Sequence, residues 1–268
     1  MSRPQLRARS ATEIVDAAFQ LYRRDPLTYL LISAICYAPL LVMQLLVVGP
    51  ATTIEEQIAA MTSGFSLFLM FGYWVSLSLL SATIVRLSSE DYLGRHYEPS
   101  MAVRDALGHL PKVMFAIFFK YLFIVIGFAF LFFPALWVLA RYFAVTAGIV
   151  LENQGVVGTF SRSAKLSRGR KMHILGTSLL AFIIFFVIYF AVTIVGGMTG
   201  SVVITTLLTI AASIVAWPMF GIVEMLLYYD ARVRAEGFDI EMMEAGLGEL
   251  APVESADMGS RSERSEGI

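Results

Sequence analysis

The sequence contains few of the side chains that bind metals or form disulfides. In 268 residues there is one cysteine, Cys36, and there are three histidines, His96, His109 and His173. One cysteine excludes a disulfide within the chain and a metal cluster held by thiolates, and Cys36 is expected to serve in packing. The histidines are scattered without the spacing of metal ligands. We therefore expect no metal and no cofactor.

Catalytic motifs are missing as well. The chain has no glycine-rich phosphate loop, no H-E-x-x-H pair and no G-x-S-x-G nucleophile elbow. Hydrolytic chemistry needs acidic, His or Cys side chains gathered in one pocket, and no such grouping is visible. The sequence predicts a protein that is not an enzyme, has no catalytic residues and has no nucleic-acid partner.

Charge is scarce, and apolar residues take its place. Charged residues make up 15% of the chain and hydrophobic residues 57%, with a mean hydropathy of +0.72. A water-soluble domain of this size could not bury so much apolar surface. A membrane-spanning helix needs about 20 mostly apolar residues. Six stretches approach that length: 27–49, 64–85, 113–133, 134–151, 174–198 and 202–227. The expected fold is an all-α integral membrane protein with six transmembrane helices.

The third and fourth stretches form one long apolar run. Between 113 and 151 only Lys120, Pro134 and Arg141 interrupt it. As a single helix it would be about 58 Å long, against a hydrocarbon thickness of about 30 Å. The run must therefore fold back, and we expect the turn between Gly127 and Pro134.

Positive charge is strongly asymmetric along the chain. Of the 20 Lys and Arg residues, all but Lys120 and Arg141 lie before the first stretch, after the last, or in alternate connections. The other connections carry only Glu55 and Glu56. By the positive-inside rule, the protein is a multi-pass protein of the cytoplasmic membrane with both termini in the cytoplasm. We expect a basic tail at 1–9, a membrane domain at 10–245 and a disordered cytoplasmic tail at 246–268.

About three amphipathic helices are expected on the cytoplasmic side, before the first, third and fifth spans. The first follows a capping box formed by Ser10 and Glu13, the second ends at Pro111, and the third covers "NQGVVGTFSRSAKLSRGRK". Such helices lie at the lipid boundary. Ordinary basic loops with chance amphipathicity are the alternative. After the last span the helix is expected to continue to Gly237.

Four short segments carry a family resemblance. They are "AAFQLYRRDP" (17–26), Pro134 with Arg141, "LENQG" followed by "FSRSAKLSRGR" (151–170), and "LYYDARVRAEGFD" (227–239). In this order they resemble the glycerophosphoryl diester phosphodiesterase membrane-domain family, a group of six-span prokaryotic membrane proteins. Some members attach this domain to a phosphodiesterase barrel. The resemblance covers only the membrane part, so it implies the six-span fold and no catalytic residues.

Ionisable groups inside a bilayer are costly and normally have a partner or reach water. Lys120 lies about 12 Å from the inner boundary at helical rise. It could pair with Glu224 near the cytoplasmic end of the last span, or extend to inner headgroups without a protein partner.

Arg141 is the second such group. On a straight helix from Pro134 it would lie about 10 Å below the outer surface, where no span offers a carboxylate. Either it uses backbone carbonyls and outer headgroups, or it binds an anionic group such as a lipid phosphate in a polar cavity.

Three functional hypotheses follow. The first is a non-enzymatic membrane protein that organises lipid, or a membrane or cytoplasmic protein partner, through its basic inner face, with Arg162, Lys165 and Arg168 as lipid contacts. The second is a transporter or flippase-like permease for an amphiphilic anion, with Arg141 and Lys120 on its path. An intramembrane enzyme of lipid metabolism is the third, and the missing catalytic cluster is evidence against it.

Overall fold

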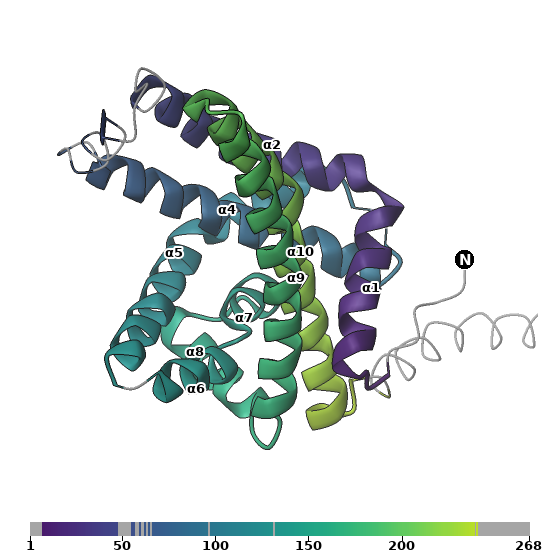
Figure 1. Ribbon diagram of the computed structural model, residues 1–268. Coiled ribbons are helices and arrows are strands. Elements are labelled where there is room, and N and C mark those ends of the chain that lie inside the picture. The colour runs from purple at the N-terminus through teal and green to yellow at the C-terminus, as the bar shows by residue number, and fades with distance from the viewer. Residues whose placement is uncertain are drawn as a thin grey trace, which may run out of the picture.

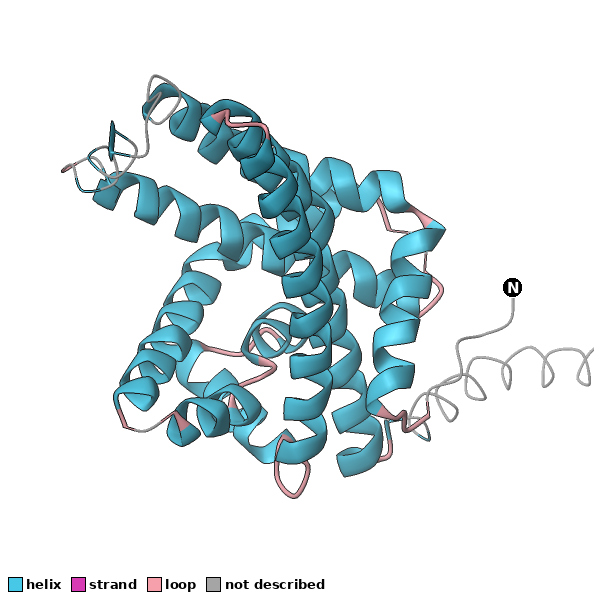
Figure 2. Cartoon of the chain, in the orientation of Figure 1, coloured by secondary structure: helices cyan, strands magenta, loops and turns pink. Residues whose placement is uncertain are grey.

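The computed structural model describes residues 7–47, 66–95, 97–130, 132–238 and 240, and the isolated positions 55, 56, 59, 62 and 64. Residues 1–6 of the predicted basic tail and the predicted tail at 246–268 lie outside this range. The described chain is helical, without strands (Figure 2). Its helices are α1 (Ala11–Arg24), α2 (Pro26–Val47), α4 (Ser66–Tyr92), α5 (Pro99–Ala129), α6 (Phe133–Arg141), α7 (Val145–Glu152), α8 (Val156–Leu166), α9 (Lys171–Met198) and α10 (Val202–Glu236).

Five stretches among the described residues are long and apolar enough to cross a membrane. They are Leu67–Tyr92, Pro99–Ala129, Phe133–Glu152, Lys171–Met198 and Val203–Glu236. The predicted span at 27–49 falls on α2, a helix of 22 residues whose first part, Pro26–Ala38, is apolar. The chain is therefore a multi-pass membrane protein, with five candidate spans in the described residues where the sequence predicted six.

The spans differ in how much of their surface the protein itself covers. In the most apolar part of Lys171–Met198 only 6% of the residues are buried, against 56% in that of Phe133–Glu152. Aromatic and aliphatic side chains such as Phe186 and Val187 are about half exposed on α9. An apolar helix that buries so little against protein needs lipid around it, because water would leave this surface unfavourably hydrated.

Helices α9 and α10 form an antiparallel hairpin through the middle of the molecule (Figure 1). Its turn ends at Ser201, whose side chain accepts a hydrogen bond from the backbone N–H of Ile204. α10 then continues without a break to Glu236, and Gly237 ends it in the left-handed region at φ 67°. This confirms the predicted continuation of the last helix to Gly237.

The first amphipathic helix, α1, begins as the sequence predicts. Ser10 and Glu13 form the reciprocal hydrogen bonds of a capping box, and these contacts lower the pKa of the Glu13 carboxyl. The helix buries Ile14, Ala18 and Leu21 along one face. In Figure 1, α1 stands beside the lower half of α10, and it packs against both α9 and α10.

The second predicted amphipathic helix is not a separate element. Pro111, which we expected to end it, lies inside α5, and the helix continues to Ala129. Proline removes one backbone donor and bends a helix without always ending it. The chain then turns before Phe133, within the stretch expected to fold back. Gly127 allows this turn to be tight, because a Cβ there would lie 2.6 Å from the backbone nitrogen of Ala135.

The buried core lies where the C-terminal halves of α4 and α10 meet α7 and the beginning of α5. Its largest fully buried side chains include Tyr29, Leu80, Ile149 and Tyr228. Burying one such side chain contributes about 1.5–3 kcal/mol. This core holds the ends of the helices together, and the same region contains the polar contacts described next.

Candidate functional site

A break in the fourth apolar stretch positions the polar groups of this protein. The span predicted at 134–151 matches the candidate span Phe133–Glu152, but its helix is interrupted, because α6 ends at Arg141 and α7 begins at Val145. The three residues between them, Tyr142–Ala144, form a turn. In Figure 1, α7 is seen nearly end-on, whereas α6 runs across the view, so the two helices point in different directions. Breaking a helix frees backbone groups that must find new partners in a low-dielectric interior.

Two side chains from other helices accept hydrogen bonds from the freed backbone N–H groups at the start of α7. Glu224 on α10 accepts hydrogen bonds from the backbone N–H of Thr146 at 3.0 Å and of Ala147 at 3.4 Å, both through Oε1. The hydroxyl of Ser163 on α8 accepts from the N–H of Ala144 at 3.2 Å. A carboxylate at a helix N-terminus also interacts favourably with the helix dipole. Glu224 therefore caps α7.

Side-chain hydroxyls of α8 donate hydrogen bonds to the backbone carbonyls around the break. Ser163 donates its hydroxyl proton to the carbonyl of Arg141 at 3.0 Å, and Thr159 donates to the carbonyl of Val145 at 2.9 Å. This close approach depends on Gly148, where a Cβ would lie 2.4 Å from Oγ1 of Thr159. We call Glu224, Ser163 and Thr159 the helix-break cluster.

These contacts set the orientation of α8. Thr159, Ser163 and Ala164 are buried against the rest of the protein, whereas Val157 is 84% exposed. The small hydroxyl side chains are buried because the broken backbone needs hydrogen bonds that apolar groups cannot supply.

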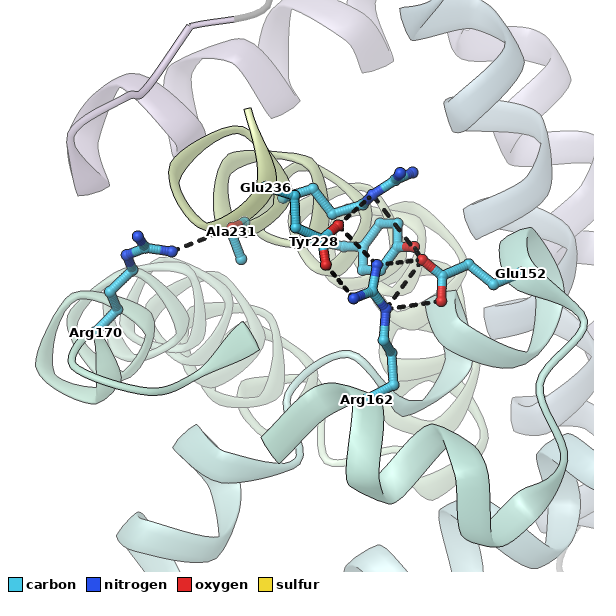
Figure 3. A network of polar contacts seen from close by, with 7 residues as sticks. Glu152, Arg162, Arg170, Tyr228, Ala231 and Glu236 are labelled. Carbon is cyan, nitrogen blue, oxygen red and sulfur yellow. Dashed lines mark hydrogen bonds and ion pairs between the residues drawn. The ribbon is translucent and has the colours of Figure 1, made fainter. Parts of the chain in front are cut away.

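A second polar cluster lies at the other end of α7 (Figure 3). Arg162 on α8 donates to both oxygens of Glu152, at 2.6 Å from Nη2 and 2.8 Å from Nε, and it also forms an ion pair with Glu236 on α10. Tyr228 donates its hydroxyl to Glu152, and Arg232 pairs with Glu236 at 3.2 Å. We call these five residues the Glu152 network. The carboxylates of Glu236 and Glu152 raise the pKa of the Arg162 guanidinium, because they stabilise its charged form.

Asp230 forms the third cluster and fixes the start of the chain to α10. Its buried carboxylate accepts from the backbone N–H of Arg9 at 2.8 Å and from Nε of Arg234 at 2.9 Å. Nε2 of His173 lies 3.3 Å from the same carboxylate. Arg234 in turn donates to the carbonyl of Arg9 at 2.7 Å. Nearby, Arg170 donates to the carbonyl of Ala231 (Figure 3) and to that of Arg234.

The three predicted lipid contacts on α8 fall into two kinds. Arg162 is engaged by the carboxylates of the Glu152 network, so its charge is balanced within the protein. Lys165 and Arg168 are exposed, and neither side chain has a hydrogen bond or ion pair with a described residue. Their charge is therefore available to an external partner.

Arg141 is the last residue of α6 and lies beside the beginning of α9. Its guanidinium carbon is 4.7 Å from the ring centroid of Trp137, and Nζ of Lys171 is 5.5 Å from the same centroid. Lys171 is the first residue of α9 and follows a strongly basic connection. The expected depth of Arg141, about 10 Å below the outer surface, stays a prediction, because α6 runs unbroken from Phe133 to Arg141. Its backbone carbonyl belongs to the helix-break contacts.

Lys120 and Glu224 do not form the predicted ion pair. Among the ion pairs of the described residues none joins them, and the carboxylate of Glu224 faces the backbone of α7 instead. Lys120 is half-buried on α5 and has no side-chain hydrogen bond within the described part of the chain.

Sequence reasoning missed most members of these clusters. Asp230 is spaced to pair with Arg234, as it does, but other partners of Glu152 and Asp230 lie up to 221 positions away. Nothing in the local sequence identifies Thr159 and Ser163 as helix-capping residues of another helix. Within the described residues no group of three or more His, Cys, Asp or Glu side chains is placed to hold a metal ion.

Two of the four segments that carry the family resemblance, 151–170 and 227–239, supply all members of the Glu152 network. Comparison of the chain with protein-family models, with curated proteins and with solved structures gave no match.

Proposed function

We propose that this is a non-enzymatic membrane protein that gathers anionic lipid at the cytoplasmic face, through exposed cations at the C-terminal end of α8. One observation supports this function: Arg162 is neutralised by two carboxylates, whereas Lys165 and Arg168, on the following turns, are exposed and unpaired among the described residues. Carboxylates of the protein balance the charge of Arg162. The charges of Lys165 and Arg168 have no such partner among the described residues.

Unpaired cations next to a membrane span attract anionic headgroups. The attraction is about 1 kcal/mol for each Lys or Arg near the surface, which is about a five-fold gain in affinity for each charge. α8 is followed after four residues by α9, the helix that is covered least by protein. Lys165 and Arg168 are therefore close in sequence to a lipid-exposed surface.

The orientation belongs to the same proposal. The basic connections lie on one side by the positive-inside rule, which puts both termini and α8 in the cytoplasm. The sequence motifs favour membership of the glycerophosphoryl diester phosphodiesterase membrane-domain family. A membrane or cytoplasmic protein that binds the same cations is the alternative partner.

Lipid analysis of the purified protein tests this function. Lys165 and Arg168 would both be changed to Gln, and the lipids that co-purify in mild detergent quantified by mass spectrometry. The expected result is a several-fold loss of anionic lipid relative to zwitterionic lipid. The matched control exchanges the two residues, Lys165→Arg with Arg168→Lys, which preserves both charges and should retain the lipid. An unchanged anionic fraction in the Gln variant would contradict the proposal.

A transporter or flippase-like permease for an amphiphilic anion is the second candidate, and the break between α6 and α7 favours it. Discontinuous membrane helices form the substrate sites of many transporters. For this candidate, flux of labelled anionic lipid would be compared in vesicles that contain the wild type or Arg141→Leu. Equal flux in both would count against transport that depends on Arg141.

A further inference from the structure

We propose that Arg141 and Lys171, which converge on the ring of Trp137, bind a phosphate group, supplied by the headgroup of an anionic lipid. This inference deepens the proposed function and rests on it for the nature of the lipid. It concerns a different place in the fold, the contact between α6 and α9, and uses none of the residues at the end of α8.

The geometry brings two positive charges to one aromatic ring. The guanidinium carbon of Arg141 lies 4.7 Å from the Trp137 centroid, and Nζ of Lys171 lies 5.5 Å from it. The indole ring attracts each cation through its negative face. The two cations repel each other, and this repulsion grows as the surroundings exclude water. A bound anion between them would turn the repulsion into attraction.

Protein carboxylates do not provide that anion. Neither α6 nor α9 contains an Asp or Glu, and these two helices supply both cations. α5, the other helix that packs closely on α6, has Asp105 as its only acidic residue. Asp105 forms an ion pair with Arg86 at 3.1 Å. None of the ion pairs among the described residues includes Arg141 or Lys171.

Arg141 also has an unused donor. Its Nε is buried and has no hydrogen-bond partner in the described structure. A buried donor without an acceptor is destabilising, because it has lost its hydrogen bonds to water. Phosphate oxygens match the planar fork of a guanidinium, and Lys adds a point charge from a second direction. A phosphate group can therefore satisfy both cations at once.

The surroundings favour phosphate on a lipid. Trp137 on α6 is 47% exposed, and Met172, the neighbour of Lys171, is 81% exposed. Large apolar side chains that remain exposed beside two cations are typical of the boundary between headgroups and acyl chains. Inorganic phosphate offers the same charged oxygens without acyl chains, so the experiment includes both sources.

Tryptophan fluorescence can report on this site directly. The chain has three tryptophans, so Trp74→Phe with Trp217→Phe leaves Trp137 as the only one. In this background the protein would be reconstituted in bilayers with brominated phosphatidylglycerol or brominated phosphatidylcholine as quencher. We expect phosphatidylglycerol to quench Trp137 selectively. Arg141→Gln with Lys171→Gln should reduce this preference by about five-fold for each charge.

Two further variants keep the result interpretable. Arg141→Lys with Lys171→Arg preserves the charge and should retain most of the selectivity, which shows that loss in the Gln variant does not come from misfolding. Lys165→Gln with Arg168→Gln should leave the quenching of Trp137 unchanged. If that variant loses co-purified lipid while Trp137 stays selectively quenched, both sites exist. If it loses no lipid, the α8 proposal fails and the Trp137 result stands on its own.

The phosphate arm uses detergent-solubilised protein titrated with sodium phosphate, with chloride keeping the ionic strength constant. A change in Trp137 fluorescence that requires Arg141 and Lys171, without lipid selectivity in bilayers, would assign the site to free phosphate and support the phosphate chemistry. Equal quenching by both lipids together with no response to phosphate would overturn the proposal.

Discussion

The carboxylate of Glu224 on α10 caps the N-terminus of α7, because Oε1 lies 3.0 Å from the backbone nitrogen of Thr146. An acidic residue that the sequence places inside a membrane span thus has a backbone partner and needs no cation. The same contact links α10 to α7, at the point where the fourth apolar stretch is broken.

Removing this cap should destabilise the protein. Glu224→Ala leaves the N–H groups of Thr146 and Ala147 without an acceptor, and we expect a loss of about 1–2 kcal/mol in the free energy of unfolding. Glu224→Gln keeps an amide oxygen and should lose less, mainly the interaction with the helix dipole. Thermal unfolding in mild detergent measures both. Identical melting temperatures for Ala, Gln and wild type would show that the cap contributes nothing.

Ser163 should be more sensitive to substitution than its neighbour. Ser163→Ala removes the acceptor of the Ala144 N–H and the donor to the Arg141 carbonyl at a buried position, at a cost of about 1–3 kcal/mol. Ser161 is exposed on the same helix, so Ser161→Ala serves as the control and should unfold like the wild type. Equal unfolding temperatures for the two variants would contradict the orientation of α8 described above.

Substitutions of Arg162 and Lys165 should have different effects, one on stability and the other on lipid binding. Arg162→Gln breaks contacts with Glu152 and Glu236, and hydrogen bonds between charged groups contribute about 1.5–3 kcal/mol each, less here because Arg162 retains some exposure. We expect a lower melting temperature. Lys165→Gln should leave the melting temperature unchanged and reduce bound anionic lipid. The opposite assignment of the two effects would refute the division of the α8 cations into structural and free.

The contact between α7 and α8 requires a residue without a side chain. Gly148→Ala places a methyl group 2.4 Å from Oγ1 of Thr159, so the helices must move apart, with an expected cost of about 1–3 kcal/mol. A Cβ added at Gly176 on α9 would have no heavy atom within 4 Å. Gly176→Ala should therefore be neutral or slightly stabilising. Unfolding of both variants in detergent checks this, and a neutral Gly148→Ala would mean that the two helices are not in close contact.

Local signals in the sequence predict a large part of this fold. Apolar runs mark the long helices, the Ser10–Glu13 box marks the start of α1, and Gly237 marks the end of α10. These features depend on residues within a few positions of each other, so the sequence displays them directly.

Features that depend on distant partners could not be predicted in this way. The break at Tyr142–Ala144 contains no proline or glycine. It is stabilised because Glu224 and Ser163 accept hydrogen bonds from the backbone N–H groups there. Arg162 looks like a free cation in its own helix, because Glu236 lies 74 positions further along the chain.

The distance in sequence between α7 and its cap has a consequence for biosynthesis. Thr146 emerges from the ribosome 78 residues before the carboxylate that accepts its N–H. Until α10 enters the membrane, the beginning of α7 must keep water or another temporary acceptor nearby, since lipid offers none. α10 therefore completes the folding of α7, which is made earlier, and a nascent chain that ends before Glu224 would present an incompletely bonded segment to the cell's quality-control proteases.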